Sequence, residues 1–228
     1  MDNIHVHDTS SQQTFAQQVV EEPIYSSQQL ADIRTYEADL CAHMEHNPHR
    51  LAHSMSVAKT AQHLALVYGV DTFKARVAGI LHDWEKVNTT ADQLAKAREL
   101  NIDFGVDLTL VGALVHGPIA QKTLVQRYPK LSADILQAIA RHTIADEQMS
   151  DLDKVVFIAD AIEPLRAPVQ ALDHLRSQVG QLDLDSLFWE TFVEGILYVL
   201  STHRYLYPRT IEIYNTLVIQ RATTKEHA

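Results

Sequence analysis

The feature that most constrains this chain is the spacing of its apolar residues, which recur every three or four positions almost continuously from about Gln29 onward. That period places apolar side chains on one face of an α-helix, whereas a half-buried strand would alternate at every second residue. Turn-forming residues are scarce, with seven glycines and seven prolines in 228 residues. A sandwich or barrel made of tight hairpins needs more of them. We therefore predict an all-α fold.

Breaks in the pattern indicate where the helices begin and end. Asn47-Pro48 is a break of this kind, and Gly69 is typical of a helix C-terminus. The pattern predicts helices over residues 30–44, 49–68, 72–84, 91–99, 108–116, 184–200 and 210–220, with others beginning at Gly117-Pro118, after Ser132 and after Ser150. Residues 1–28 are rich in Ser, Gln and Thr instead, so we expect a polar, flexible N-terminal tail before a single domain.

Composition excludes several classes of protein. Nineteen basic against 29 acidic residues give a net charge of −10, which argues against nucleic-acid binding, because few cations are available to displace phosphate counterions. The single cysteine, Cys41, excludes an internal disulfide and a thiolate zinc site. The sequence has neither a run of 18 apolar residues nor a basic and then apolar N-terminus. We therefore expect no membrane span, no secretory signal and a cytoplasmic location.

Histidine is unusually frequent, with 13 residues, and several lie in strongly apolar helical segments. A lone histidine on an apolar face is usually structural. An ionised carboxylate inside an apolar run is costly to bury, by several kcal/mol as an order of magnitude, unless a cation or hydrogen-bond donors compensate it. One metal centre is the simplest common explanation for the polar residues placed in this way, which are His53, His82, Asp83, His116, His142 and Asp160.

The residue types narrow the choice of metal. Imidazole and carboxylate ligands without thiolate suit Fe, Mn, Co, Ni or Zn, whereas Ca²⁺ and Mg²⁺ sites use fewer histidines. A site with three or four protein ligands and room for water is typical of hydrolytic catalysis, because a bound metal lowers the pKa of water.

Five segments of the chain resemble a known family. They are HRLAHSMSVAKTAQHLA, AGILHDWEK, HGPIA, ARHT and MSDLDKVVFIADAIEPLR, and together they cover residues 49–166 densely. They are similar to the YqeK family of symmetrical bis(5'-nucleosyl)-tetraphosphatases, within the HD superfamily of metal-dependent phosphohydrolases. The resemblance implies an HD-type helical bundle over residues 29–222, with a motif core at 49–166 and accessory C-terminal helices at 170–222.

The resemblance also implies an activity and a set of site residues. The activity is the hydrolysis of diadenosine tetraphosphate into two ADP, with iron as the expected ion. The implied metal ligands are His53, His82, Asp83 and Asp160. The positions implied to contact the nucleotide are Arg50, Lys86, His116, His142, Thr143, Met149 and Arg166. Among these, Lys86 and His116 are the implied catalytic residues, and a protonated His116 or His142 is expected to neutralise phosphate charge.

One segment departs from the family pattern. The family often has a Thr-Gly pair after the residues matching His142-Thr143, whereas this chain has Ile144-Ala145. We expect this loop to hold the nucleotide differently.

Several alternatives stay open at this point. The chain could be an HD nucleotidase, a guanosine-alarmone hydrolase, a non-catalytic nucleotide-binding regulator, or an all-α scaffold with incidental histidines. His116 and His142 could complete a second metal site or bind phosphate above a single metal, and we favour the single metal. The segment FWETFVEGILYVL could supply the face of a homodimer.

Overall fold

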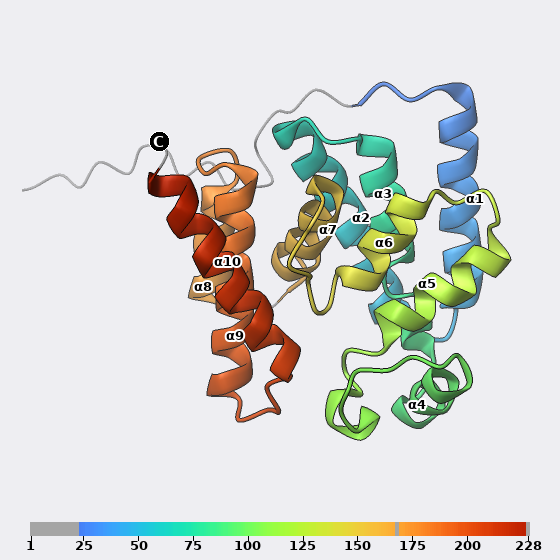
Figure 1. Cartoon of the computed structure of the whole chain (residues 1–228). Coiled ribbons are helices and arrows are strands. Elements are labelled where there is room, and N and C mark those ends of the chain that lie inside the picture. Colours follow the sequence, from blue (N-terminus) through green and yellow to red (C-terminus); the bar gives the residue numbers. More distant parts are fainter. Residues whose placement is uncertain (1–22, 167–168, 227–228) are drawn as a thin grey trace, which may run out of the picture.

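The computed structural model describes residues 23–166 and 169–226, and every regular element in these ranges is a helix (Figure 1). The predicted all-α fold is confirmed. Most of the predicted tail, residues 1–22, lies outside the described residues, and the first helix begins at Ser27. The α-helices are α1 (Ser27–His43), α2 (Pro48–Tyr68), α3 (Thr72–Leu81), α4 (Thr90–Glu99), α5 (His116–Arg127), α6 (Ala133–Arg141), α7 (Asp151–Ile162), α8 (Gln170–Gln178), α9 (Leu184–Ser201) and α10 (Pro208–Glu226).

Local sequence signals determine several of these helix ends. The side chain of Asn47 caps α2 by accepting the N–H of Arg50 at 3.2 Å, and α2 ends at Gly69 with φ +69°, a left-handed conformation that glycine adopts at little cost. Ser150 begins α7 in a reciprocal capping box with Asp153. These three boundaries agree with the sequence prediction.

Two predicted helices differ from the structure. α3 ends at Leu81, so His82 is its C-cap residue and Lys86 falls in a separate short 3₁₀ helix, η2 (Trp84–Val87). The segment over residues 108–116 is not one α-helix either, because it forms the 3₁₀ helix η3 (Leu108–Val111) followed by a turn. Both segments form i→i+3 hydrogen bonds, which wind the chain more tightly than an α-helix and are common in short connectors.

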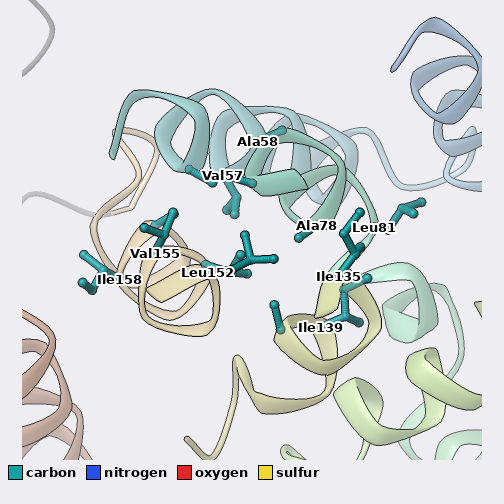
Figure 2. Packing of buried hydrophobic residues seen from close by; sticks show 14 of the residues in the cluster. Val57, Ala58, Ala78, Leu81, Ile135, Ile139, Leu152, Val155 and Ile158 are labelled. Atoms are coloured by element: carbon teal, nitrogen blue, oxygen red, sulfur yellow. The ribbon is translucent and has the colours of Figure 1, made fainter. Parts of the chain in front are cut away.

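Helix α7 packs between the two halves of the molecule. It contacts α2, α3 and α6 on one side and α8 and α9 on the other. Figure 1 shows α8, α9 and α10 forming a layer beyond α7, with α1 at the opposite edge. Figure 2 shows the packing between α7 and its neighbours, where Val155 lies on the side of α7 that faces Val57 of α2, and Ile158 points away from α2. The apolar cluster runs from Ile33 in α1 to Ile213 in α10.

Helices α2 and α3 approach each other closely at Gly79. A Cβ atom on Gly79 would lie 2.6 Å from the Cα of Ala58, so only a glycine fits at this crossing. The crossing brings together the two segments of chain that bear His53 and His82.

A smaller apolar cluster supports the segment between α4 and α5. It contains Phe104, Val111 and Ile119. Tyr207, next to α10, connects this cluster to the C-terminal helices, because its hydroxyl donates a hydrogen bond to the carbonyl of Phe104 at 2.9 Å.

The domain boundaries over 29–222 stay a prediction. None of the helices in the described part of the chain is long and apolar enough to cross a membrane.

Candidate metal centre

Six polar side chains from different helices converge in the interior of the molecule. Their candidate ligand atoms form three overlapping groups of three, and within each group all atoms lie within 4.8 Å of one another. The six residues are His53 of α2, His82 at the end of α3, Asp83 directly after it, His116 at the start of α5, His142 at the end of α6, and Asp160 of α7.

One half of the cluster contains the four predicted metal ligands. The Nε2 of His53 lies 3.0 Å from Oδ1 of Asp160 and 3.4 Å from Nε2 of His82. Oδ2 of Asp83 lies 3.6 Å from the His53 Nε2 and 3.7 Å from the His82 Nε2. The structure therefore brings together four residues that are spread over more than 100 positions of the sequence.

The other half lies against the second oxygen of Asp83. Oδ1 of Asp83 is 3.1 Å from Nε2 of His116 and 3.8 Å from Nε2 of His142. The carboxylate of Asp83 thus lies between the two pairs of imidazoles, with one oxygen facing each pair.

The rings of His82, His116 and His142 are anchored in the same way. In each, Nδ1 lies within hydrogen-bond distance of the carbonyl oxygen three residues earlier, at 2.7, 3.0 and 2.6 Å in that order. A carbonyl oxygen can only accept, so Nδ1 carries the proton in these rings. In a neutral imidazole, Nε2 is then an unprotonated nitrogen whose lone pair is directed into the cluster.

The contact between His116 and His142 indicates what this cluster requires. Burial lowers the pKa of His116, and burial together with the neighbouring His116 lowers the pKa of His142 to about 3. Both rings are neutral at pH 7, which corrects the expectation that a protonated His116 or His142 supplies positive charge. Their Nε2 atoms are 3.0 Å apart, so two lone pairs face each other. A cation bound beside them removes this repulsion, and the residues present therefore fit a metal.

The two carboxylates are ionised in this environment. Burial alone would raise the pKa of Asp83, but positive charge on the neighbouring His82 and His116, when these rings hold a second proton, lowers it well below its usual value. At Asp160 burial is likewise outweighed by the imidazoles in contact with it and by the guanidinium of Arg166. Negative charge and imidazole nitrogen are the donor set that a divalent transition metal prefers.

Cations lie on the open side of the cluster. Arg50 donates to Oδ2 of Asp83 at 2.9 Å, and Arg166 donates to Oδ1 of Asp160 at 2.6 Å. The side chain of Asp160 is 21% exposed and that of Arg166 is 42% exposed, so this edge of the cluster faces solvent. The Nζ of Lys86 lies 3.5 Å from a backbone carbonyl oxygen in the turn before α5. The sequence-predicted cations are therefore grouped near the carboxylates, although Lys86 is not on a continuation of α3.

Two of the predicted site residues lie outside the cluster. The hydroxyl of Thr143 donates to the carbonyl of Leu114 at 3.2 Å, and Thr143 lines a cavity of about 590 Å³. Met149 lines a different cavity, of about 600 Å³, together with Trp189. The first cavity also touches Ala113 and is lined by the rings of Phe157, Phe192, Tyr198, Tyr205 and Tyr207.

The departure from the family pattern after Thr143 has a structural counterpart. Ala145 has φ +67°, in the left-handed region that a glycine adopts more easily. The backbone of this turn therefore has the shape that favours glycine, and this chain forms it with an alanine, whose N–H donates to the carbonyl of Arg141 at 2.9 Å.

Sequence reasoning missed one residue of the centre, Glu163. Its Oε1 lies 3.0 Å from Nδ1 of His53, and its side chain is 1% exposed. Burial opposes a charge on His53, yet the contacts with Asp160 and Glu163 outweigh it and raise the pKa of His53 to about 9. The available signal was the position of Glu163, which follows Asp160 by three residues and therefore lies one helical turn away.

The helical bundle and its cluster of histidines and aspartates define the class of protein. The chain belongs to the HD domain family, whose model matches residues 50–165. Similarity to curated proteins assigns the chain to a particular group within this family. A protein of Staphylococcus aureus named "Bis(5'-nucleosyl)-tetraphosphatase, symmetrical" is 34% identical over 170 residues, which cover 73% of this chain and 85% of the relative. A Bacillus subtilis protein with the same name is 30% identical over 183 residues, covering 80% of this chain and 96% of the relative.

A solved structure is also similar. It is the crystal structure of a predicted HD superfamily hydrolase involved in NAD metabolism from Clostridium acetobutylicum, with a TM-score of 0.72 and 29% sequence identity. The similarity covers 87% of this chain and all of that one. The resemblance to the symmetrical bis(5'-nucleosyl)-tetraphosphatases, first drawn from the motifs, is therefore confirmed as membership of that family.

Proposed function

We propose that this protein is a metal-dependent hydrolase that cuts diadenosine tetraphosphate symmetrically into two ADP. The observation that carries the proposal is the convergence of imidazole nitrogens and carboxylate oxygens next to a solvent-facing edge with two guanidinium groups. The names of the relatives support this activity and this substrate.

The ion is the first component of the proposal. His53, His82, Asp83 and Asp160 would hold it, and iron is proposed, although Mn, Co, Ni and Zn suit the same donors. When bound, such an ion lowers the pKa of water and polarises a phosphoryl oxygen.

The number of ions is a separate question. We propose one ion, with His116 and His142 as phosphate contacts whose Nε2 atoms would take up a proton when phosphate binds, because only a protonated nitrogen donates to a phosphate oxygen. The competing arrangement with two ions is favoured by the grouping of Asp83, His116 and His142 within 4.8 Å. Elemental analysis of the purified protein distinguishes one ion per chain from two.

The cations of the chain would bind the phosphates. Arg50 and Arg166 each use part of the guanidinium group on a ligand carboxylate, which leaves other N–H groups for phosphate oxygens. The Nζ of Lys86, which lies 3.5 Å from the carbonyl oxygen of Ala113, adds a compact positive charge that interacts with Asp83 and Asp160. These groups would neutralise the charge that grows on the oxygens as water adds to a central phosphorus and the bridging P–O bond breaks. Each half then leaves as ADP, and both hydrogens of the water are released as protons when the two new terminal phosphates are fully ionised.

The aromatic cavity would receive the nucleoside of the bound half. It begins at Ala113 and Thr143, beside the cluster, and its volume of about 590 Å³ lies in the range of small-molecule sites. Purine bases stack on aromatic rings of this kind. Tyr198 and Tyr205 come from beyond the matched segment at 50–165. This is why we propose one domain over 29–222, in which the accessory helices at 170–222 complete the site.

Product analysis is the direct test of this function. Diadenosine tetraphosphate incubated with the metal-loaded protein should give ADP alone on ion-exchange chromatography, and ADP should inhibit competitively and more strongly than AMP. Equal amounts of ATP and AMP would contradict symmetrical cleavage. A panel containing nucleoside monophosphates and guanosine alarmones tests the alternative hydrolases, and the absence of turnover on every substrate would favour a non-catalytic regulator.

Three further features belong to the proposal. A homodimer through α9 is proposed because Leu197, Tyr198 and Leu200 are each 52% exposed, and sedimentation equilibrium measures it. A cytoplasmic location suits a free nucleotide substrate. The net charge of −10 makes nucleic-acid binding unfavourable.

A further inference from the structure

Glu163 is a buried carboxylate that the proposed mechanism does not use. It is the C-cap residue of α7 and only 1% exposed. A buried carboxylate is costly unless hydrogen-bond donors surround it, so its partners indicate what it does.

The two oxygens of Glu163 have different partners. Oε2 accepts the N–H of Leu165 at 2.7 Å, which ties the carboxylate to the end of its own helix. Oε1 lies 3.0 Å from Nδ1 of His53. The backbone at this helix end is itself fixed, because Arg176 of α8 donates to the carbonyl of Glu163 at 2.9 Å and to that of Ile162 at 2.8 Å. The position of Oε1, which faces His53, is therefore fixed by the hydrogen bond to Oε2 and by the two hydrogen bonds from Arg176 to the backbone.

His53 needs such a partner because of its place in the fold. His82, His116 and His142 lie at helix ends or in the turn before a helix, where Nδ1 reaches the carbonyl three residues earlier. His53 lies inside α2, where the carbonyl groups are used by the helix itself. A side chain from another element is the remaining way to fix Nδ1, and Glu163 supplies it.

We propose that Glu163 is a positioning residue for metal binding that acts through His53. This inference rests on the metal centre of the proposed function. The carboxylate accepts the Nδ1 proton, so Nε2 is the nitrogen that faces Asp160 and the rest of the cluster, and it becomes a metal ligand once it gives up its own proton. A carboxylate bound to the far nitrogen also makes the imidazole a stronger metal ligand, and loss of such a partner typically weakens metal binding about 10- to 100-fold.

Titration of the metal-free, full-length protein with Mn²⁺ by calorimetry tests this role. Glu163→Ala should bind Mn²⁺ about 10- to 100-fold more weakly than the natural sequence. Glu163→Gln should restore part of the loss, because its amide oxygen still accepts the Nδ1 proton but carries no charge. This rescue separates positioning from a purely structural role.

Asp153→Asn is the matched control. Asp153 is a fully buried carboxylate of the same helix, and its partners are Arg141, Gln137 and the backbone N–H of Ser150 rather than the cluster. Its Mn²⁺ affinity should stay at that of the natural sequence.

The possible outcomes separate the inference from the function on which it rests. Mn²⁺ affinities of Glu163→Ala and the natural sequence that agree within about twofold would overturn the inference, as would an equal loss in Asp153→Asn. If Glu163→Ala does not fold, an unchanged affinity in Glu163→Gln overturns it. Failure of the natural sequence to bind Mn²⁺ would instead overturn the metal centre itself.

Discussion

Asp83 and Glu85 are two residues apart in the sequence, and both are buried, with 3% and 2% exposure, yet their surroundings are opposite in kind. Glu85 accepts hydrogen bonds from Lys96 at 2.9 Å on each oxygen, and from Thr123 and Asn88 at 2.8 and 3.0 Å. Every partner of Glu85 is a donor, and the carboxylate is satisfied by the protein alone.

Asp83 has Arg50 as a donor, but its other neighbours are imidazole nitrogens. For His82 and His116 the proton lies on the far nitrogen, which is bonded to a backbone carbonyl, so the near nitrogen is a lone pair. Burial of a carboxylate therefore does not by itself identify a site. A structural carboxylate is surrounded by hydrogen-bond donors, which satisfy its charge. A carboxylate of a metal site lies beside nitrogen atoms with unprotonated lone pairs, which require a cation.

The largest effect should come from removing the carboxylate of Asp83. Asp83→Ala removes the group between the two pairs of imidazoles, and we expect neither bound metal nor hydrolysis. Elemental analysis and an ADP-release assay measure the two losses. Stoichiometric iron or manganese together with full turnover in the variant would show that Asp83 is no ligand.

The next effect tests the donors on the open side of the cluster. Arg166→Ala and Lys86→Ala should keep the metal but lose charge stabilisation in the transition state, lowering kcat/KM roughly 30- to 1000-fold, or about 2–4 kcal/mol. Lys96→Met is the matched control, because Lys96 is the donor of the Glu85 network and should leave kcat/KM unchanged. If both Arg166→Ala and Lys86→Ala retain the natural kcat/KM, these residues do not belong to the site.

A smaller effect should come from changing Glu85, and it should appear in the stability of the fold rather than in the rate of hydrolysis. Glu85→Gln keeps the volume but removes the charge from a hydrogen-bonded network, so the free energy of unfolding should fall by about 1.5–3 kcal/mol. Urea denaturation measures this change, and the metal content per chain should be that of the natural protein. Loss of metal without loss of stability would reverse the assignment of the two carboxylates.

The smallest effect concerns the backbone after His142. Ala145 has φ +67°, and Ala145→Gly relieves this conformation at the cost of a more flexible unfolded chain and a lost methyl group. We expect a net gain of about 0.5 kcal/mol in the free energy of unfolding. A melting temperature lower than that of the natural protein would mean that the buried methyl group contributes more than the strain costs.

Much of the fold is predictable from local signals. The period of apolar residues gives the helices, and Gly69 and the capping box at Ser150 give boundaries that the structure reproduces. The end of α3 at Leu81 is not predictable in this way, because apolar residues continue past it. The chain leaves the helix there because Glu85 and Lys86 have partners on other elements.

The site is predictable to a different degree. The cluster of six residues can be inferred because histidine and aspartate are out of place in apolar helices. Glu163 cannot be inferred in this way, because an acidic residue before a proline at a helix end is ordinary on a protein surface. Its burial depends on α8 packing over the end of α7, which no local pattern reveals. Thr143 and Met149 follow the family pattern, but the structure places them beside cavities rather than in the cluster.

The anchoring of the four imidazoles also bears on the order in which the centre forms. Three of the rings find their acceptor three residues away, so they adopt their orientation as soon as the local turn exists. The acceptor of His53 is 110 residues further along the chain. Closing so large a loop is slow compared with forming a turn. During synthesis, a nascent chain that has not yet produced Glu163 has no acceptor that fixes the proton of His53 on Nδ1. We therefore expect the chain to bind metal only after α7 has docked on α2.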